Sequence, residues 1–315
     1  GGPSERIHFG PGAAVSIEQH EYTGFVQDKW TIHPRLTVDA GLRSDRDSVS
    51  DEGHVAPRLG FAIAPLGGTR TAIRGGVGLF YGRINLNVPT FLSMPERTVT
   101  GYLSDGSVLG TAEYKHRLAG SIDNPRSIAW NVELQQVVLR DLVLRTGYSQ
   151  RNTVRDFFIE PGPDAEALIL SNKGRNRYRE FQVTARYQIQ RHALNGSYVR
   201  SSAIGDLNDF NVFFGNTPTA LIRPNERTLL PFDAPHRFLF WGQFEVPGKI
   251  TLAPVFDVHT GFPYSVVDEE RNFVGARNRA GRFPRFSSLD LQVTKEISLP
   301  IAGRKYKAHV GCRIF

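Results

Sequence analysis

The sequence of 315 residues has a single cysteine, Cys312, which excludes an internal disulfide framework and a cysteine-rich metal site. It contains no apolar run of about 20 residues, so a bundle of membrane-spanning helices is excluded. A basic start followed by a short apolar stretch, the mark of a secretory signal peptide, is also missing. Charged residues make up only 22% of the chain and aromatic residues 11%, a composition that is too apolar for a disordered chain.

Positive charge and turn-forming residues are plentiful. The 38 lysines and arginines outnumber the 31 acidic residues, and the net charge of +7 favours anionic partners such as nucleic acid, phosphorylated lipid headgroups or an acidic ligand. The 31 glycines, 19 prolines, 21 phenylalanines and 10 tyrosines are typical of a chain with many strands and turns. Composition does not choose among these partners.

Apolar and polar residues alternate over segments of about ten residues, which predicts strands with two different faces. The clearest alternation lies within residues 36–43, 58–64, 70–79, 127–135, 180–188, 288–297 and 305–314. Weaker alternation is found near 22–32, 142–151, 193–202, 235–246 and 249–260. No long helical stripe competes with this pattern, so we expect roughly twelve strands.

The connections between these strands alternate in length. Short ones lie near 33–35, 65–68, 139–141, 190–192, 247–248 and 298–303, and long ones near 46–54, 82–125, 152–176, 203–234 and 261–285. All long connections therefore leave one end of the sheet, as in outer-membrane barrels, and a ten-residue strand tilted by about 45° rises roughly 23 Å, close to their apolar band of about 25 Å. We expect an all-β, antiparallel, up-and-down outer-membrane β-barrel, here partial, with sequence neighbours paired and no parallel crossover.

The two faces of the expected strands differ in chemistry. Glycine and arginine occur together on the polar face, which suits a concave, water-filled lumen, and aromatic residues flank the apolar face. The residues expected on the convex apolar side are Leu36, Val38, Leu59, Phe61, Phe181, Val183, Leu289 and Leu291. Those expected on the concave side are Arg58, Arg74, Glu133, Gln135, Arg186 and Asp290. The alternative is a half-buried sheet or soluble sandwich, in which the apolar set packs as a dry core.

Several segments, in order, resemble strands of TonB-dependent outer-membrane receptors. The first are 22–30 (YTGFVQDKW), 36–43 (LTVDAGLR), 56–61 (APRLGF) and 74–81 (RGGVGLFY). Segments 233–237 (DAPHR) and 259–265 (HTGFPYS) are similar to the branch in which a carboxypeptidase-regulatory-like domain precedes the plug. The resemblance covers residues from about 21 to 315.

The resemblance implies a 22-stranded barrel with an N-terminal plug, loops that capture a scarce ligand, and active uptake driven through TonB. It also implies the bacterial outer membrane as the location, contact with outer-membrane lipid and lipopolysaccharide, and no enzymatic activity. We expect residues 1–315 to be one C-terminal barrel segment that lacks the plug and signal peptide, so that the TonB system acts only through the missing plug. We expect Phe315 to be a truncation point, because Gly311 is one place off the usual spacing of a terminal assembly signal; a true C-terminus at Phe315 is the alternative.

Catalytic and cofactor motifs are missing from the sequence. There is no nucleophile elbow, no zinc-binding His-Glu-x-x-His and no phosphate-binding Gly-x-x-x-x-Gly-Lys, so we expect no enzyme and no cofactor. Two acidic groups contain oxygen ligands of the kind that Ca²⁺ prefers, but neither has the spacing of a known calcium loop. They are Asp206, Asn208 and Asp209, and Asp45, Asp47, Asp51 and Glu52.

Two basic segments are expected in outward loops, next to lipopolysaccharide phosphates or an anionic ligand. One contains Lys173, Arg175, Arg177 and Arg179; the other contains Arg271, Arg277, Arg279, Arg282 and Arg285 with Phe273, Phe283 and Phe286. Arginine interleaved with phenylalanine also suits base stacking, so a basic β-protein that binds nucleic acid is one alternative function. A passive porin-like pore is the other, and a solvated loop is the plainest interpretation.

The longest connection, 82–125, holds many apolar residues and is expected to fold over the lumen or over neighbouring loops. Together with the arginine-rich segment it predicts an apolar floor with a cationic rim, suited to an amphipathic anion. The predicted ligand-binding residues are Phe91, Met94, Tyr102, Arg271, Arg277, Arg279 and Arg282. The ligand itself stays open among an iron chelate, cobalamin, a glycan and a peptide, and nucleic acid is not the expected partner.

Overall fold

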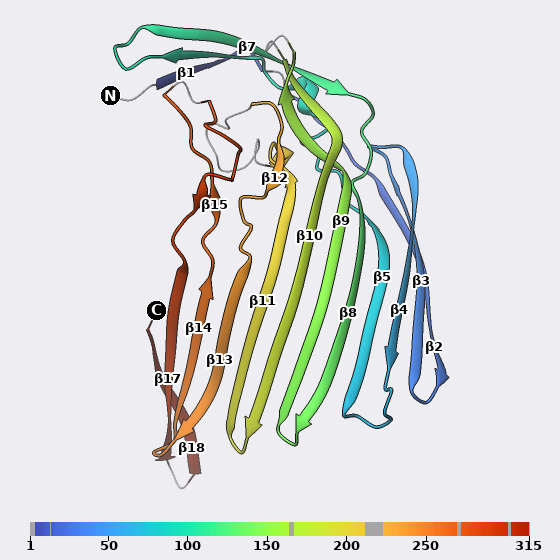
Figure 1. Cartoon of the computed structure of the whole chain (residues 1–315), viewed down its shortest axis with the longest axis vertical. Helices are drawn as coiled ribbons and strands as arrows, with labels where there is room; N and C mark the ends of the chain where they lie inside the picture. Colours follow the sequence, from blue (N-terminus) through green and yellow to red (C-terminus); the bar gives the residue numbers. More distant parts are fainter. Residues whose placement is uncertain are drawn as a thin grey trace.

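The computed structural model describes residues 4–12, 14–163, 167–211, 223–269, 272–301 and 304–314. Its main sheet is an antiparallel meander of twelve strands that curves into an open half-cylinder (Figure 1). The strands are β2 (Glu21–His33), β3 (Leu36–Asp47), β4 (Glu52–Ile63), β5 (Thr71–Tyr81), β8 (Arg126–Leu139), β9 (Leu142–Pro161), β10 (Ala167–Ile189), β11 (His192–Asp206), β13 (His236–Val246), β14 (Ile250–His259), β17 (Phe286–Ile301) and β18 (Arg304–Ile314). The predicted number, order and antiparallel pairing of these strands are confirmed.

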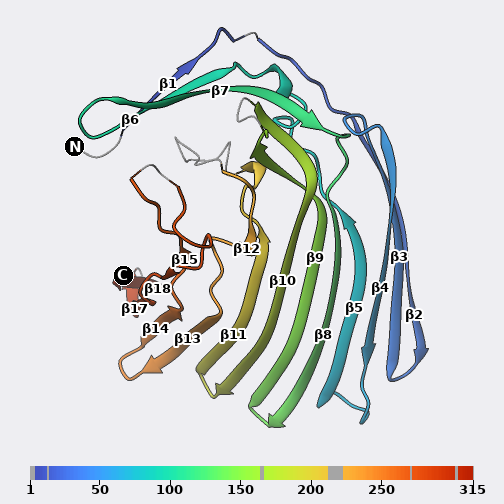
Figure 2. The same cartoon turned by 45° about the horizontal axis from the view of Figure 1, so that its top comes forward.

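Shorter elements lie in the connections at one end of the sheet, which we call the loop end. They are β1 (Ser4–Phe9), η1 (Phe91–Ser93), β6 (Arg97–Tyr102), β7 (Val108–Ala119), β12 (Arg227–Leu229), β15 (Pro263–Tyr264) and β16 (Gly281–Arg282). Strands β1, β6 and β7 form a layer across this end (Figure 2). No helix in the described ranges is long and apolar enough to cross a membrane.

One pairing at the loop end differs from the expectation. Strand β7 runs parallel to the start of β10, with residues 115–119 beside 167–171. The sequence predicts no parallel crossover, and this parallel pair departs from that expectation, because the connection 82–125 contains a hairpin whose second strand lies along β10. This pair lies outside the meander, in which every neighbour is antiparallel.

Two connections that the sequence predicts to be long are shorter in the structure. Residues 46–54 form a tight turn, because Asp47 pairs with Glu52 and β3 continues directly into β4. Residues 152–176 mostly extend the β9–β10 hairpin, whose pairing continues to Pro161 and Leu168. The many polar residues of this region suggest a loop, but most of them pair across the two strands, in a ladder that has register shifts between Ser171 and Arg175.

The strand register places the predicted apolar residues on one face, because directly paired residues of antiparallel strands point to the same side. Val38 stands opposite Phe61, and the ladder continues from Leu59 to Val77. This face is uncovered in the described chain: the exposed fraction is 53% for Leu59, 41% for Phe61, 41% for Phe181 and 61% for Leu289. A dry core between two sheets, the alternative, is therefore wrong.

The other face of the sheet is polar, as predicted. Arg74 Nη1 lies 3.3 Å from Glu133 Oε1 and donates to Gln135 Oε1 at 3.1 Å across the β5–β8 pair. A hollow of about 800 Å³ lies on this face, which makes it the concave one; its lining includes Gln27, Asp39, Arg58, Gly76, Gly78 and Asn131. A Cβ at position 60 would collide with the Asp39 carboxylate in its present position, so a side chain there would displace that group.

The buried core lies at the loop end rather than in the wall. Its fully or nearly fully buried members come from η1, the adjoining segment, the extended ends of β9 and β10, and the segment after β11: Ile84, Val88, Phe91, Phe157, Ile159, Leu168, Leu170 and Phe210. The prediction that the connection 82–125 folds over neighbouring loops is therefore confirmed. The loop end has a hydrophobic core of its own.

This core gives a test of the loop end. Phe91 has no exposed surface, so replacing it by alanine would leave a buried cavity whose walls are held by strands. The substitution should destabilise the loop end by about 3–5 kcal/mol. Limited proteolysis should then cut residues 84–118 at least about tenfold faster than in the unchanged protein. The neighbouring Leu92→Ala is the matched control, because that side chain is 54% exposed. Equal cleavage of the two variants would contradict the loop core.

Candidate ligand-binding site

The predicted apolar site residues lie in two places at the loop end. Phe91 is in the buried core and Met94 packs against it. The Phe91 ring meets the His116 ring edge-on at 4.7 Å between centroids, and burial, followed by the charge of Arg97, lowers the pKa of His116. Tyr102 ends β6 in the overlying layer, so the structure joins Phe91 and Met94 and separates Tyr102 from them.

The predicted arginines of the connection 260–285 hold that connection onto the chain segment 206–233. Arg277 Nη1 donates to Asn208 Oδ1 at 2.7 Å, and its guanidinium lies 4.5 Å from the centre of the Phe273 ring. Burial lowers the pKa of Arg277. Arg279 Nε donates to Thr228 Oγ1 at 2.8 Å, and Arg279 is an exposed residue. Arg271 lies outside the described residues.

Arg282 forms the most buried ion pair among the described residues of the loop end. Its Nη2 lies 2.5 Å from Asp233 Oδ2, its Nη1 donates to the Asp233 carbonyl at 2.6 Å, and the Asp233 side chain is 2% exposed. Asp233 Oδ1 accepts from the backbone N–H of Ala203 at 2.7 Å. A Cβ at Gly261 would come 1.8 Å from the Phe283 carbonyl oxygen, so only glycine allows this approach. Arg282 donates to the carbonyls of both Asp233 and Gly261. It therefore joins the segments 233–237 and 259–265, which the sequence singles out separately.

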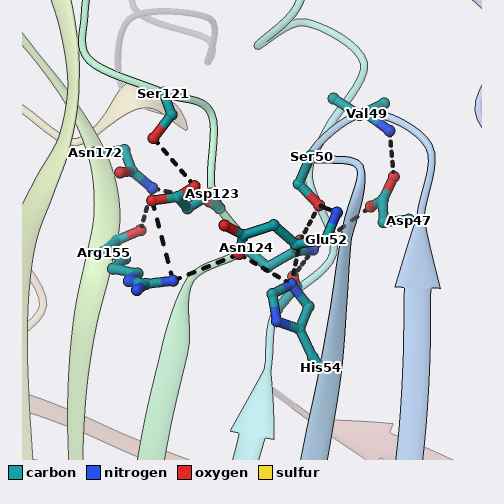
Figure 3. A network of polar contacts seen from close by, with 11 residues as sticks. Asp47, Val49, Ser50, Glu52, His54, Ser121, Asp123, Asn124, Arg155 and Asn172 are labelled. Atoms are coloured by element: carbon teal, nitrogen blue, oxygen red, sulfur yellow. Dashed lines mark hydrogen bonds and ion pairs between the residues drawn. The ribbon is translucent and has the colours of Figure 1, made fainter.

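A buried amide joins the first half of the loop end (Figure 3). Asn124 is 4% exposed, and its Oδ1 accepts from Ser50 Oγ at 2.7 Å and lies 2.8 Å from His54 Nε2. Its Nδ2 donates to the Gly82 carbonyl at 3.0 Å and lies 3.5 Å from Asp47 Oδ2. Both lone pairs and both N–H groups of the amide are thus used, which fixes the β3–β4 turn against the start of β8.

A neighbouring set of contacts extends this network to β9 and β10 (Figure 3). Asn172 Nδ2 donates to the Asp123 carbonyl at 2.8 Å and to the Arg155 carbonyl at 3.2 Å. Arg155 Nη1 lies 3.8 Å from Glu52 Oε2 and 4.0 Å from Asp123 Oδ2. Arg155 has a φ of 58°, a bulge conformation in which the strand turns its side chain toward these carboxylates.

A cavity of about 400 Å³ lies between the ends of β9 and β10 and the segment 206–232. Its walls are aromatic and aliphatic, and Asp156, Asp206 and Asp209 lie along it. Burial, followed by the negative charge of Asp209, raises the pKa of Asp156. The carboxylates already accept hydrogen bonds: Asp156 from Asn176, Asp206 from Asn225, and Asp209 from the Asn211 backbone.

Neither acidic group that the sequence offers for Ca²⁺ is arranged as a metal site. Asn208 Oδ1 accepts from Arg277, and the oxygens of Asp45 and Asp51 face Arg43 and Arg46. Within the described ranges, no cluster of three or more His, Cys, Asp or Glu side chains is placed to hold a metal ion. The structure therefore gives no support to calcium.

Sequence reasoning missed the residues that organise the loop end. Asn124 and Asp233 stand in irregular segments, where asparagine and aspartate are common for turn formation alone, and Asn172 stands at a register shift within β10. Their partners are 17 to 77 residues away in the chain. One feature of the sequence could have indicated Asp233: the motifs at 233–237 and 259–265 occur in the same chain, and they lie together in the structure.

The Asn124 network gives a second test. Asn124→Asp replaces two donors by acceptors beside Asp47, so it should destabilise the loop end by about 2–3 kcal/mol. Hydrogen exchange of the amides in residues 48–54 and 120–126 should accelerate by roughly 30- to 150-fold. Asn87→Asp is the matched control, because Asn87 is exposed. Slow exchange retained in the Asn124 variant would show that the network does not hold these segments.

No protein-family model and no curated protein matches the chain. Solved structures of similar fold are found: the outer membrane transporter YddB from Escherichia coli (14% identity, TM-score 0.60, 88% of this chain and 39% of that chain); the FrpB iron transporter from Neisseria meningitidis (10%, 0.60, 88% and 38%); and the siderophore receptor PirA from Acinetobacter baumannii (12%, 0.63, 93% and 41%). The chain spans about two fifths of the length of these proteins. At these identities the likeness establishes a shared fold: an open antiparallel β-sheet that matches part of the barrels of these proteins.

Proposed function

We propose that this chain is a wall segment, with its extracellular loops, of a TonB-dependent transporter in the bacterial outer membrane. The observation that carries the proposal is the exposed apolar face of a twelve-stranded antiparallel meander whose loops gather at one end. Water does not tolerate an apolar face of this extent, whereas lipid does. The likeness to outer-membrane transporters supports the same conclusion. Uptake, not catalysis, is then the work of the protein.

We further propose the branch of these receptors in which a carboxypeptidase-regulatory-like domain precedes the plug. The two segments that resemble this branch, 233–237 and 259–265, pack together in the structure. Thr260 N–H donates to the His236 carbonyl at 2.9 Å, and Arg282 binds both the Asp233 and Gly261 carbonyls. The two segments therefore support each other through these hydrogen bonds, which gives a reason for both to occur in the same chain.

For the ligand we propose an anionic ferric chelate. Two of the proteins of similar fold are an iron transporter and a siderophore receptor, and the net charge of +7 favours an anion. Among the predicted ligand-binding residues, Arg279 offers an exposed guanidinium, which Thr228 orients. Arg277 and Arg282 position the segment that carries it, and Phe91 and Met94 support the loops from below.

A passive pore is the second candidate function. The concave face carries charged side chains and a hollow of about 800 Å³, features that also suit a water-filled channel. The two candidates differ in whether uptake needs energy, so one transport assay separates them. The nucleic-acid alternative loses its main support, because Arg277 stacks on Phe273 within the chain and leaves that ring engaged.

The test is uptake of ⁵⁵Fe-citrate by iron-starved cells that carry or lack the gene for the full-length protein. Uptake should rise at least about tenfold with the gene and disappear when a proton uncoupler is added. Arg279→Gln should raise the concentration for half-maximal uptake by about tenfold, because a charged hydrogen bond is lost. The control is Arg140→Gln at the short β8–β9 turn, which should change nothing. Uptake that survives the uncoupler would identify a passive pore, and no uptake would exclude this chelate.

A further inference from the structure

Five arginines lie on the apolar, convex face of the sheet at its loop end. The register fixes their side: Arg126 and Arg175 both stand opposite Val154, and Arg179 stands opposite Gln150, which faces Trp130. Arg177 is two residues from Arg179 on the same strand, and Arg200 stands opposite Phe181. Because strand side chains alternate, all five share the face of Trp130 and Phe181. We call Arg126, Arg175, Arg177, Arg179 and Arg200 the arginine row.

The arginine row has no partner within the described chain. None of its five guanidinium groups forms a hydrogen bond or an ion pair with a described residue, and the Nε of Arg126 is buried without an acceptor. Two arginines of the concave face are paired, in contrast: Arg74 with Glu133 and Arg237 with Asp257. Like charges on neighbouring strands repel one another, so an anion from outside the chain would stabilise the row.

The row lies just above an aromatic and aliphatic band on the same face. Its nearest exposed neighbours are Ile128 (48%), Trp130 (38%), Phe181 (41%), Tyr198 (37%) and Phe238 (42%). From Arg179 to the end of β10 at Ile189 the strand runs ten residues, which rise roughly 25 Å at a tilt of about 40°. That distance equals the apolar band of an outer-membrane barrel, so the row stands at its outer boundary.

We propose that the arginine row binds the phosphate groups of lipopolysaccharide headgroups in the outer leaflet. Guanidinium forks bind phosphate oxygens bidentately, and several arginines within one headgroup's reach can hold more than one phosphate. Directly paired positions place side chains about 5 Å apart and diagonal ones about 7–8 Å apart, so Arg179 and Arg200 can meet the same headgroup. A ligand inside the barrel does not reach this face. The inference rests on the membrane location proposed above.

The test measures binding of bisphosphorylated lipid A to the full-length protein, purified in detergent from outer membranes and freed of lipid. Arg177→Gln with Arg179→Gln should weaken the affinity about 30- to 100-fold, because two charged contacts are lost. The matched control is Arg145→Gln with Arg186→Gln, which removes two exposed charges from the concave face. This control should bind as the unchanged protein does. Equal affinity of the two double variants would overturn the proposal.

Further arms identify the source of the phosphate and separate this inference from the proposed function. Dephosphorylated lipid A should bind weakly, and 10 mM inorganic phosphate should compete little; strong binding or full competition would overturn the assignment to a lipid headgroup. If the double variant fails to insert, Arg200→Gln alone should weaken binding about tenfold. Absence of the unchanged protein from the outer-membrane fraction would refute the proposed function. Correct insertion with unchanged lipid affinity in the variants would refute the arginine row alone.

Discussion

The register of the antiparallel ladder is the constraint on which the rest of the structure depends. Side chains alternate along each strand, so the pairing of Arg58 with Gly78 and of Leu59 with Val77 decides the chemistry of both faces at once. A slip of one residue at any strand would exchange its apolar and polar sets. Because the same parity holds across twelve strands, the chain gains one continuous apolar face and one polar face with a hollow.

The loop end solves a problem that this arrangement creates. A wall with an uncovered apolar face has no core that could anchor its connections, and such long connections need internal support. The chain supplies a separate core around Phe91, a buried amide at Asn124 and an ion pair at Asp233. Each of these joins segments that are distant in sequence. Together they turn several connections into one packed layer from which an exposed group such as Arg279 can act.

The arginines of this chain have different roles, so residue type alone does not predict the role of a side chain. Arg282 forms a buried ion pair with Asp233, and Arg74 pairs with Glu133 on the concave face. Arg179 has no partner in the described chain. The sequence suggests one cationic rim for the segment around Arg277, yet that guanidinium is half-buried between Asn208 and Phe273. The sequence predicts a loop around Arg177, but this segment is part of β10, and the Arg177 side chain lies on the convex face.

The sequence by itself determined the strand count, the two faces, the antiparallel meander and the single end that carries the long connections. These follow from local periodicity and turn residues, which act over a few neighbouring positions. Only the tertiary structure decided the parallel contact of β7 with β10, the shortness of the 46–54 turn and the partners of Asn124 and Asp233. Apart from the 46–54 turn, those contacts join residues far apart in the chain, and the free energy of a buried hydrogen bond depends on which groups the fold brings together, not on their order in the sequence.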